Sequence, residues 1–262
     1  LQAKQDLDDA YEAGQKSEYD RFWDAFQQNG ERTNYCYAFA GSAWNTESLK
    51  PKHTIHPVSN LEYAVECAEG MFYRCGQDEL ELELESPLAE RKLVDMTEAC
   101  KKLDFSACDS APKIFQDSFC KNITCDFSNV TNLANAFNAT SGDIRNVKIK
   151  VSAKCNTYTN TFRYYGDWEA IEGVESSLIF LEGSVIAASR ILLSDARTLS
   201  KESIISIFNA LSATTSKLSI TLSADAVNNA FGIDVDDEST YPEGSEYYAL
   251  RHSKDNWTIN YN

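Results

Sequence analysis

The chain has 262 residues, a length that suits one large domain or a repeat array with small end modules. Its formal net charge is −16, from 40 Asp+Glu against 24 Lys+Arg, and this negative field repels nucleic-acid phosphates and anionic lipid surfaces. Hydrophobic residues make up 43% of the chain, enough for a continuous core, but no run reaches the roughly 18–20 apolar residues of a membrane span. We therefore expect a folded protein with neither nucleic-acid binding nor a membrane span.

Residues 1–60 are predicted to form an N-terminal helix, over 1–29, followed by an irregular lead-in that Gly, Asn and Pro interrupt. Asn29-Gly30 would end the helix. If copies of the chain associate, this helix is the element through which we expect a homo-oligomer to form. Its apolar residues fall near one face: Leu7, Tyr11, Phe22 and Phe26.

Residues 61–199 carry a degenerate internal repeat. The second apolar position of four short alternating stretches recurs in steps of 21, 22 and 24 residues, and a second apolar ladder recurs in steps of 24, 19, 22 and 25. Two ladders of nearly the same period indicate repeated structural units. The first ladder is Leu84, Phe105, Phe127 and Val151, and the second is Phe72, Met96, Phe115, Phe137 and Phe162.

Each repeat would supply one short strand and one compact turn, and neither can bury its apolar side alone. Stacking the repeats places the strands in parallel, with every second side chain pointing inward. The pattern predicts an α/β fold whose middle part, 61–199, is a solenoid. The period is blurred over 153–190, and the next strand candidates are 179–181 and 191–193.

Residues 200–262 are predicted to form a helical cap. Ser200 can cap a helix that carries an apolar face, and Ser223 can cap a second helix that Gly232 ends. A strand is expected at 218–222 and another at 257–261, where Trp257 begins an alternating pattern. The acidic segment 233–246 is expected to be an exposed loop.

The run Asp126-Phe127-Ser128-Asn129-Val130-Thr131-Asn132-Leu133-Ala134-Asn135-Ala136-Phe137 resembles the repeat unit of BspA-like leucine-rich-repeat proteins, in which such a run joins a strand to a helical turn. Anchor residues within 19–52, and within 199–212 and 256–259, resemble the phage and prophage branch of that family in gut Firmicutes. The resemblance implies a leucine-rich-repeat solenoid and a surface or tail-associated protein. No catalytic residue is carried over from it.

The chain is accordingly predicted to be no enzyme but a structural or binding protein of a phage virion. It would sit in a tail or head appendage on the virion surface and act in assembly or host recognition. Its partners would be other virion proteins, or a glycan or protein on the host cell. The alternatives are a bacterial cell-surface adhesin and, from another class, a surface glycan-active enzyme with a pocket of convergent carboxylates.

The candidate ligand-binding segment is 157–168, where the repeat loses its period. Tyr and Trp offer broad faces for sugar or protein contacts, and Asn, Thr and Asp offer hydrogen bonds. The competing interpretation is that half of these rings belong to the core, Phe162 most of all. The predicted site residues are Arg163, Tyr164, Tyr165, Asp167 and Trp168.

No cofactor or metal site is expected. His53 and His56 form H-x-x-H without the Glu of a helical zinc motif, and 234–238 lacks the central Gly and terminal Glu of a calcium loop. Nucleotide-binding glycine motifs and G-x-S-x-G are missing from the sequence. The even number of cysteines would allow four disulfides, but so large a core favours reduced, buried thiols acting as small hydrophobes. These eight are Cys36, Cys67, Cys75, Cys100, Cys108, Cys120, Cys125 and Cys155.

Overall fold

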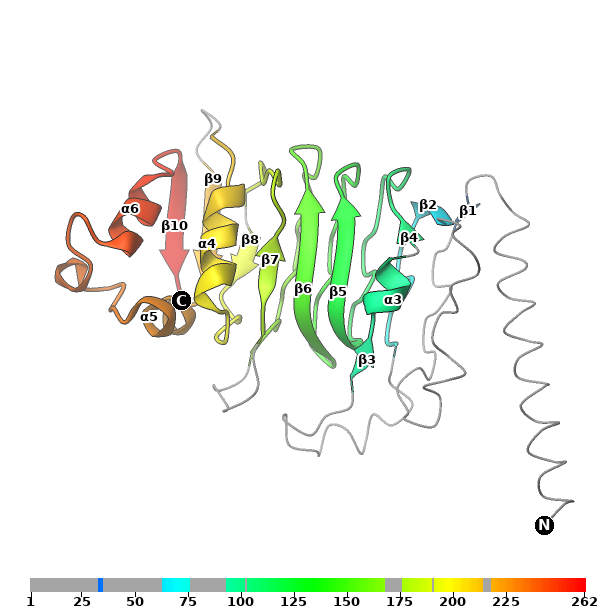
Figure 1. Ribbon diagram of the computed structural model, residues 1–262, viewed down its shortest axis with the longest axis horizontal. Coiled ribbons are helices and arrows are strands. Elements are labelled where there is room, and N and C mark those ends of the chain that lie inside the picture. Colours follow the sequence, from blue (N-terminus) through cyan, green and yellow to red (C-terminus); the bar gives the residue numbers. More distant parts are fainter. Residues whose placement is uncertain are drawn as a thin grey trace, which may run out of the picture.

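The computed structural model describes residues 33–34, 63–75, 93–101, 103–167, 176–189, 191–213 and 218–262. The predicted α/β class with parallel strands is confirmed, because every strand pairing within these ranges is parallel. Three sheets have the orders β1-β2-β4, β3-β5-β6-β7 and β10-β9-β8, and the strands follow one another across the molecule in Figure 1. The predicted helix at 1–29 and the ladder position Leu84 lie outside the described residues.

The elements have these bounds: β1 Thr33–Asn34, β2 Tyr63–Cys67, β3 Val94–Asp95, α3 Thr97–Cys100, β4 Leu103–Asp104, β5 Phe119–Phe127, β6 Asp143–Val151, β7 Leu178–Phe180, β8 Ile191–Leu193, α4 Lys201–Ala210, β9 Leu218–Leu222, α5 Ala224–Phe231, the 3-10 turn η4 Glu238–Thr240, α6 Glu246–His252 and β10 Trp257–Tyr261.

The two longest strands, β5 and β6, share one irregularity. Lys121 pairs with Arg145 and Ile123 pairs with Val147, so the residue between them on each strand is skipped in the register. Both skipped residues are asparagines with left-handed backbone, φ 58° at Asn122 and 56° at Asn146, a conformation that asparagine tolerates better than most residues. After this bulge the alternation of inward and outward side chains resumes to the end of each strand.

These bulge asparagines also join the strands through their side chains. Asn122 Nδ2 donates to Asp95 Oδ2 on β3 at 2.8 Å, and Asn146 Nδ2 donates to Asn122 Oδ1 at 3.3 Å. Ser177, just before β7, donates its hydroxyl to Asn146 Oδ1 at 3.3 Å. One row of polar side chains therefore crosses four strands and favours a single register between them.

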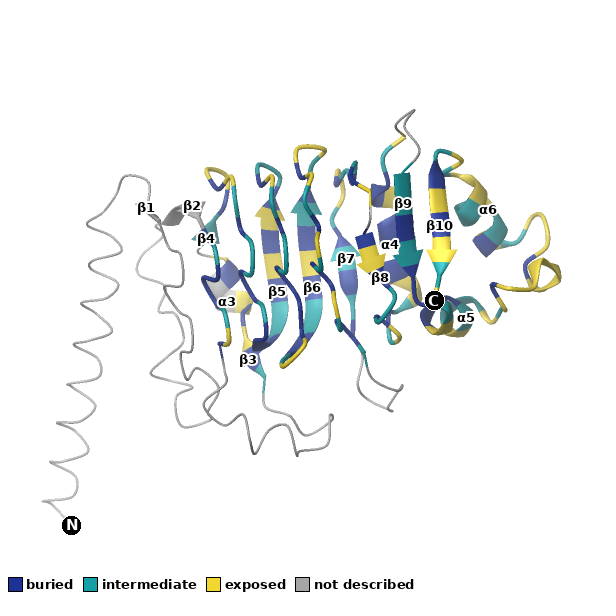
Figure 2. Ribbon diagram, turned by 180° about the vertical axis from the view of Figure 1, so that it is seen from behind, coloured by how far each residue is buried: buried dark blue, intermediate teal, exposed yellow. Residues whose placement is uncertain are grey.

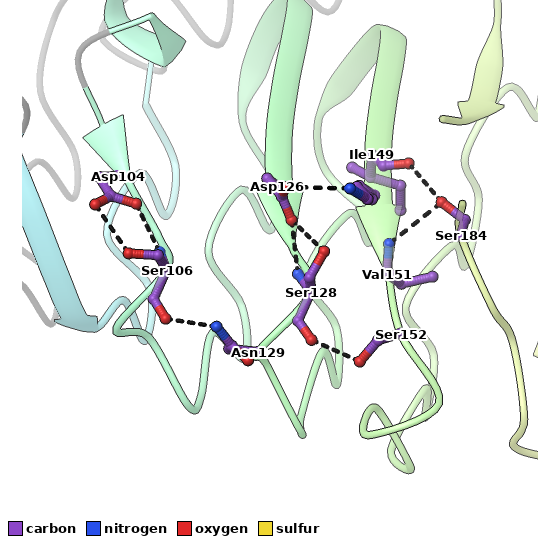
Figure 3. A network of polar contacts seen from close by, with 10 residues as sticks. Asp104, Ser106, Asp126, Ser128, Asn129, Ile149, Val151, Ser152 and Ser184 are labelled. Atoms are coloured by element: carbon purple, nitrogen blue, oxygen red, sulfur yellow. Dashed lines mark hydrogen bonds and ion pairs between the residues drawn. The ribbon is translucent and has the colours of Figure 1, made fainter. Parts of the chain in front are cut away.

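The Asp-Phe-Ser segments that end β4 and β5 form similar turns (Figure 3). The backbone N–H of Ser106 donates to Asp104 Oδ1 at 2.8 Å, and that of Ser128 donates to Asp126 Oδ1 at 2.9 Å. Ser152, at the equivalent place after β6, donates its hydroxyl to the Ser128 carbonyl oxygen at 2.5 Å. The repeated motif thus closes each turn locally and binds it to the neighbouring one.

On the opposite side of the core, four phenylalanine rings form a stack. The centroids are 5.1 Å apart for Phe72 and Phe115, 5.6 Å for Phe115 and Phe137, and 5.8 Å for Phe137 and Phe162, with interplanar angles of 8°, 14° and 3°. Their backbones pair as well, since Phe115 N donates to the Ala136 oxygen and Phe137 N to the Thr161 oxygen, each at 2.9 Å. The predicted aromatic ladder is confirmed at these four positions.

The prediction that Met96 belongs to this ladder is wrong. It follows β3 directly, and its N–H donates to the Lys121 carbonyl oxygen of β5 at 2.9 Å, so it belongs to the strand side of the molecule. The ring of Phe72 stacks directly on Phe115, with no ladder residue between them. The one-turn helix α3 interrupts the repeat here, and a steady period does not foresee such an insertion.

The helix α4 covers the edge of the four-stranded sheet and lies beside β7 (Figure 1). Its Ser203 hydroxyl accepts from the Leu178 N–H at 3.0 Å, and its Ser206 hydroxyl accepts from the Phe180 N–H at 3.1 Å. Two helix side chains therefore take the place of the next strand, which keeps this edge from pairing with another chain.

The C-terminal elements match the prediction in most places. Ser200 and Ser223 cap α4 and α5 as expected, Gly232 ends α5 with a left-handed φ of 66°, and the two predicted strands are β9 and β10. The helix α6, which Ser245 caps, was not predicted from the sequence. In the predicted exposed acidic segment, the carboxylate-bearing residues are exposed, whereas Val235 is buried.

Candidate functional site

The segment predicted to bind a ligand, 157–168, contributes Phe162 to the phenylalanine stack and leaves the stack at Arg163. Arg163 is exposed, and its guanidinium carbon lies 4.9 Å from the centroid of the Tyr164 ring. Arg163 Nη2 also donates to the Tyr164 hydroxyl oxygen at 3.2 Å. Tyr164 has a left-handed φ of 57°, which turns the chain at the point where the pair meets solvent. The pair presents planar donors beside an aromatic face, a chemistry that suits a sugar or a protein edge.

A second pair of the same kind, not predicted from the sequence, lies at the equivalent place in an earlier turn. Arg74, like Tyr164, comes two residues after a ring of the stack and has a left-handed φ of 55°. Its guanidinium carbon lies 5.2 Å from the Tyr73 ring centroid. The sequence signal for this pair is its distance from the ring stack, because Arg74 follows Phe72 by two residues, just as Tyr164 follows Phe162 by two residues.

Tyr165 has to be removed from the predicted site. Its side chain is 0% exposed, its ring meets Phe162 at 6.4 Å in an edge-on arrangement, and its hydroxyl donates to the Ser177 carbonyl oxygen at 2.7 Å. Burial also raises the pKa of the Tyr165 phenol above its usual value. The ring is part of the core, as Phe162 is, because the left-handed residue before it turns its side chain inward.

Asp167 joins Tyr164 through its backbone, whose N–H donates to the Tyr164 carbonyl oxygen at 3.3 Å. Its Oδ1 lies 3.4 Å from Arg197 Nε, in an ion pair between two partly exposed side chains. Next to it, Thr198 donates its hydroxyl to the Gly166 carbonyl oxygen at 3.2 Å. Asp167 therefore holds two surface turns together. Trp168, the last predicted site residue, lies outside the described residues.

The outward side of β5 and β6 forms a second exposed surface, which we call the outer strand face. Figure 2 shows buried, intermediate and exposed residues alternating along these strands. Although the chain carries a large negative charge, four side chains of this face are cationic. The Arg145 side chain is only 12% exposed and pairs with Asp143 at 2.6 Å, and Lys150 lies 3.9 Å from Asp126. The outer strand face consists of Lys121, Thr124, Asp126, Arg145, Lys148 and Lys150.

No group of three or more His, Cys, Asp or Glu side chains able to hold a metal ion occurs in the described parts of the chain. His252 is exposed, with Nδ1 2.9 Å from the Tyr248 carbonyl oxygen, and His53 and His56 lie outside the described ranges. Among the helices that the structure describes, none is long and apolar enough to cross a membrane.

Six cysteines have side chains that the structure describes, and these six lie in the core, as predicted. They are buried thiols with no disulfide among them: Cys75, Cys100, Cys108, Cys120, Cys125 and Cys155.

Comparisons with protein-family models, with curated proteins and with solved structures found no match to this chain.

Proposed function

We propose that the chain is a leucine-rich-repeat solenoid that works as a non-enzymatic binding or assembly protein. The observation that carries this proposal is the stack Phe72–Phe115–Phe137–Phe162, whose neighbouring rings lie 5.1–5.8 Å apart. Each of its first three members donates its backbone N–H to the carbonyl oxygen of the residue before the next ring. Repeats that contact only their neighbours produce long, regular exposed faces, and such faces serve binding in repeat proteins.

Two features of the strand ends support the leucine-rich-repeat assignment. The run from Asp126 to Phe137, on which the resemblance rests, begins at the end of a parallel strand and continues through a compact turn into the ring stack. The equivalent motif at Asp104 forms the same local hydrogen bonds. Strand and turn thus alternate where the family pattern expects them to alternate.

Within this class we favour a virion component of a phage, exposed on a tail or head appendage and acting in assembly or host recognition. The partner would be another virion protein or a glycan or protein of the host cell surface. The Arg163–Tyr164 pair supports a recognition role, because Arg163 is exposed, Tyr164 is partly exposed, and together they combine an aromatic face with planar donors. An adhesin of a bacterial surface would use the same chemistry, and the place of the protein in intact phage particles distinguishes the two.

The proposal is tested with the purified full chain, labelled and applied to a glycan array and to whole gut bacteria. We expect saturable binding to a subset of bacterial strains or glycans, and antibodies to the chain should label intact phage particles. Labelling of bacterial cells in place of particles would support the adhesin. Turnover of a glycan on the array would contradict a non-enzymatic role.

A further inference from the structure

Two buried thiols from different elements contact each other in the core. Cys100 is the last residue of the one-turn helix α3, and Cys125 lies on β5. Their Sγ atoms are 4.0 Å apart, although the residues are 25 positions apart in sequence. Cys100 is 9% exposed and Cys125 is 3% exposed. This is a pair of sulfur atoms in contact, and a disulfide would require them to approach to about 2.05 Å.

The environment makes the two sulfurs chemically unequal. The hydrogen bond from Cys125 lowers the pKa of the Cys100 thiol below its usual value, despite the opposing effect of burial. Burial raises the pKa of the Cys125 thiol, and the hydrogen bond with Cys100 adds to that rise. A thiol is nucleophilic as its thiolate, so Cys100 is the sulfur better prepared to react first.

We propose that Cys100 and Cys125 form an oxidation site, at which a small-molecule disulfide converts the two thiols into a protein disulfide. The Cys100 thiolate attacks one sulfur of the oxidant and forms a mixed disulfide, releasing one equivalent of thiolate. The Cys125 thiol then loses its proton and attacks the Cys100 sulfur, releasing the second equivalent. The protein loses two protons and two electrons, and the oxidant is reduced to two thiols.

The position of the pair gives this bond a structural consequence. The segment from β3 to β4 is held by two strands of two residues each, and these pair with different neighbours, β3 with β5 and β4 with β2. α3 interrupts the segment between them. A disulfide from α3 to β5 would tie this interruption to the longest strand pair of the sheet and would stabilise it by shortening the open chain in the unfolded state.

The experiment uses the full chain, first reduced and then incubated with oxidised glutathione, and maps the products by mass spectrometry without reduction. Trypsin separates the relevant cysteines, because Cys100 falls in peptide 93–101, Cys125 in 122–145, Cys108 in 103–113 and Cys120 in 114–121. We expect a linked species that joins 93–101 to 122–145. The melting temperature should rise by roughly 5–10 °C on oxidation and fall again when reductant is added.

Two variants make the test specific. Cys100→Ala should abolish both the 93–101 link and the rise in melting temperature. Cys155→Ala is the matched control: its buried thiol points to the Thr157 carbonyl oxygen at 4.0 Å, and removing it should leave both effects in place. The proposal is overturned if Cys100 and Cys125 remain thiols after oxidation, if Cys100 stops at the mixed disulfide with glutathione, or if either residue is linked to a different cysteine.

Discussion

The ring of Phe127 lies edge-on to the ring of Phe105, with centroids 5.0 Å apart and planes inclined by 64°. Each is the middle residue of an Asp-Phe-Ser turn, and both rings are buried. Phe127 also approaches Phe137 at 6.5 Å, so it joins the strand side of the core to the ring stack on the opposite side. The contact joins two neighbouring Asp-Phe-Ser turns within one core.

Replacing Phe127 by Ala should therefore destabilise the chain by about 3–5 kcal/mol, because the cavity would open between two repeats with little freedom to collapse. Urea unfolding followed by far-UV circular dichroism measures the change. An exposed position such as Thr124 on the same strand serves as the control, and Thr124→Ala should shift the midpoint little. An unchanged midpoint for Phe127→Ala would contradict the repeat register described above.

A second prediction separates the two neighbouring tyrosines. Tyr165→Ala should cost about 3–5 kcal/mol, because it removes a fully buried ring. Tyr165→Phe keeps the ring and loses only the 2.7 Å hydrogen bond to Ser177, at a cost of about 0.5–1.5 kcal/mol. Tyr164→Ala, at a partly exposed position, should cost less than either. Equal unfolding midpoints for Tyr164→Ala and Tyr165→Ala would show that the assignment of core and surface is wrong.

The sequence predicted the ladder of phenylalanines because their spacing is regular and each ring fills the same place in its repeat. It did not predict which of two adjacent aromatic residues points inward. That choice depends on the left-handed φ at Tyr164, and no apolar period reports a single backbone angle. A second left-handed position lies two residues before each stacked ring and is occupied by Gly70, Lys113, Asn135 and Asn160. Only Gly and Asn are residue types that indicate a positive φ from the sequence.

The prediction for Met96 was wrong for a different reason, because it extended a regular spacing through a place where the repeat is interrupted. The step from Phe72 to Met96 has a plausible length, yet the helix α3 and the short strands around it place Met96 against β5. The outer strand face was missed for a related reason. Its cations alternate with core residues along β5 and β6, and they form a surface only after two distant segments pair in register.

A third prediction concerns Gly142, which precedes β6 and lies against the backbone of the neighbouring turn. A Cβ atom added there would lie 2.6 Å from the carbonyl carbon of Asp117 and 2.6 Å from the carbonyl oxygen of Ser118. Both are backbone atoms that cannot rotate away, so Gly142→Ala should destabilise the protein by about 1–3 kcal/mol. Thermal unfolding checks this value. Ser141→Ala is the control, because it keeps the N–H that donates to Asp117 Oδ1 and should be nearly neutral.

A fourth prediction uses the pH dependence of stability at Asp95. Its partial burial would raise the pKa, but the hydrogen bonds from Thr97 and Asn122 and the charge of Lys121 outweigh it and hold the pKa below its usual value. A depressed folded-state pKa means that the unfolded chain takes up the proton first as the pH falls. The stabilisation from the ionised Asp95 is therefore full above the unfolded pKa of about 3.9 and is lost as the pH falls through the lower folded value.

Asp95→Ala should accordingly be less stable than the wild type at pH 7, and the difference should narrow below about pH 4. Urea unfolding of both proteins between pH 2 and pH 7 provides the measurement. A stability difference that stays constant over this range would show that the charge of Asp95 contributes nothing to folding.

The last prediction concerns the surface used for recognition. Arg163 and Tyr164 contact each other and are accessible, so removing both side chains should abolish binding to cells or glycans without unfolding the chain. The double variant Arg163→Ala, Tyr164→Ala leaves the neighbouring Tyr165 in the core, and its circular-dichroism spectrum and melting temperature should match those of the wild type.

The comparison variant carries Lys148→Glu and Lys150→Glu on the outer strand face, where both replacements remain on the outward side of β6. If the Arg163–Tyr164 pair makes the contact, the first variant loses binding at least tenfold, and the second keeps it. Loss confined to the lysine variant would move the binding surface to the outer strand face, since a reversal of charge there acts on an anionic partner and on nothing near Arg163.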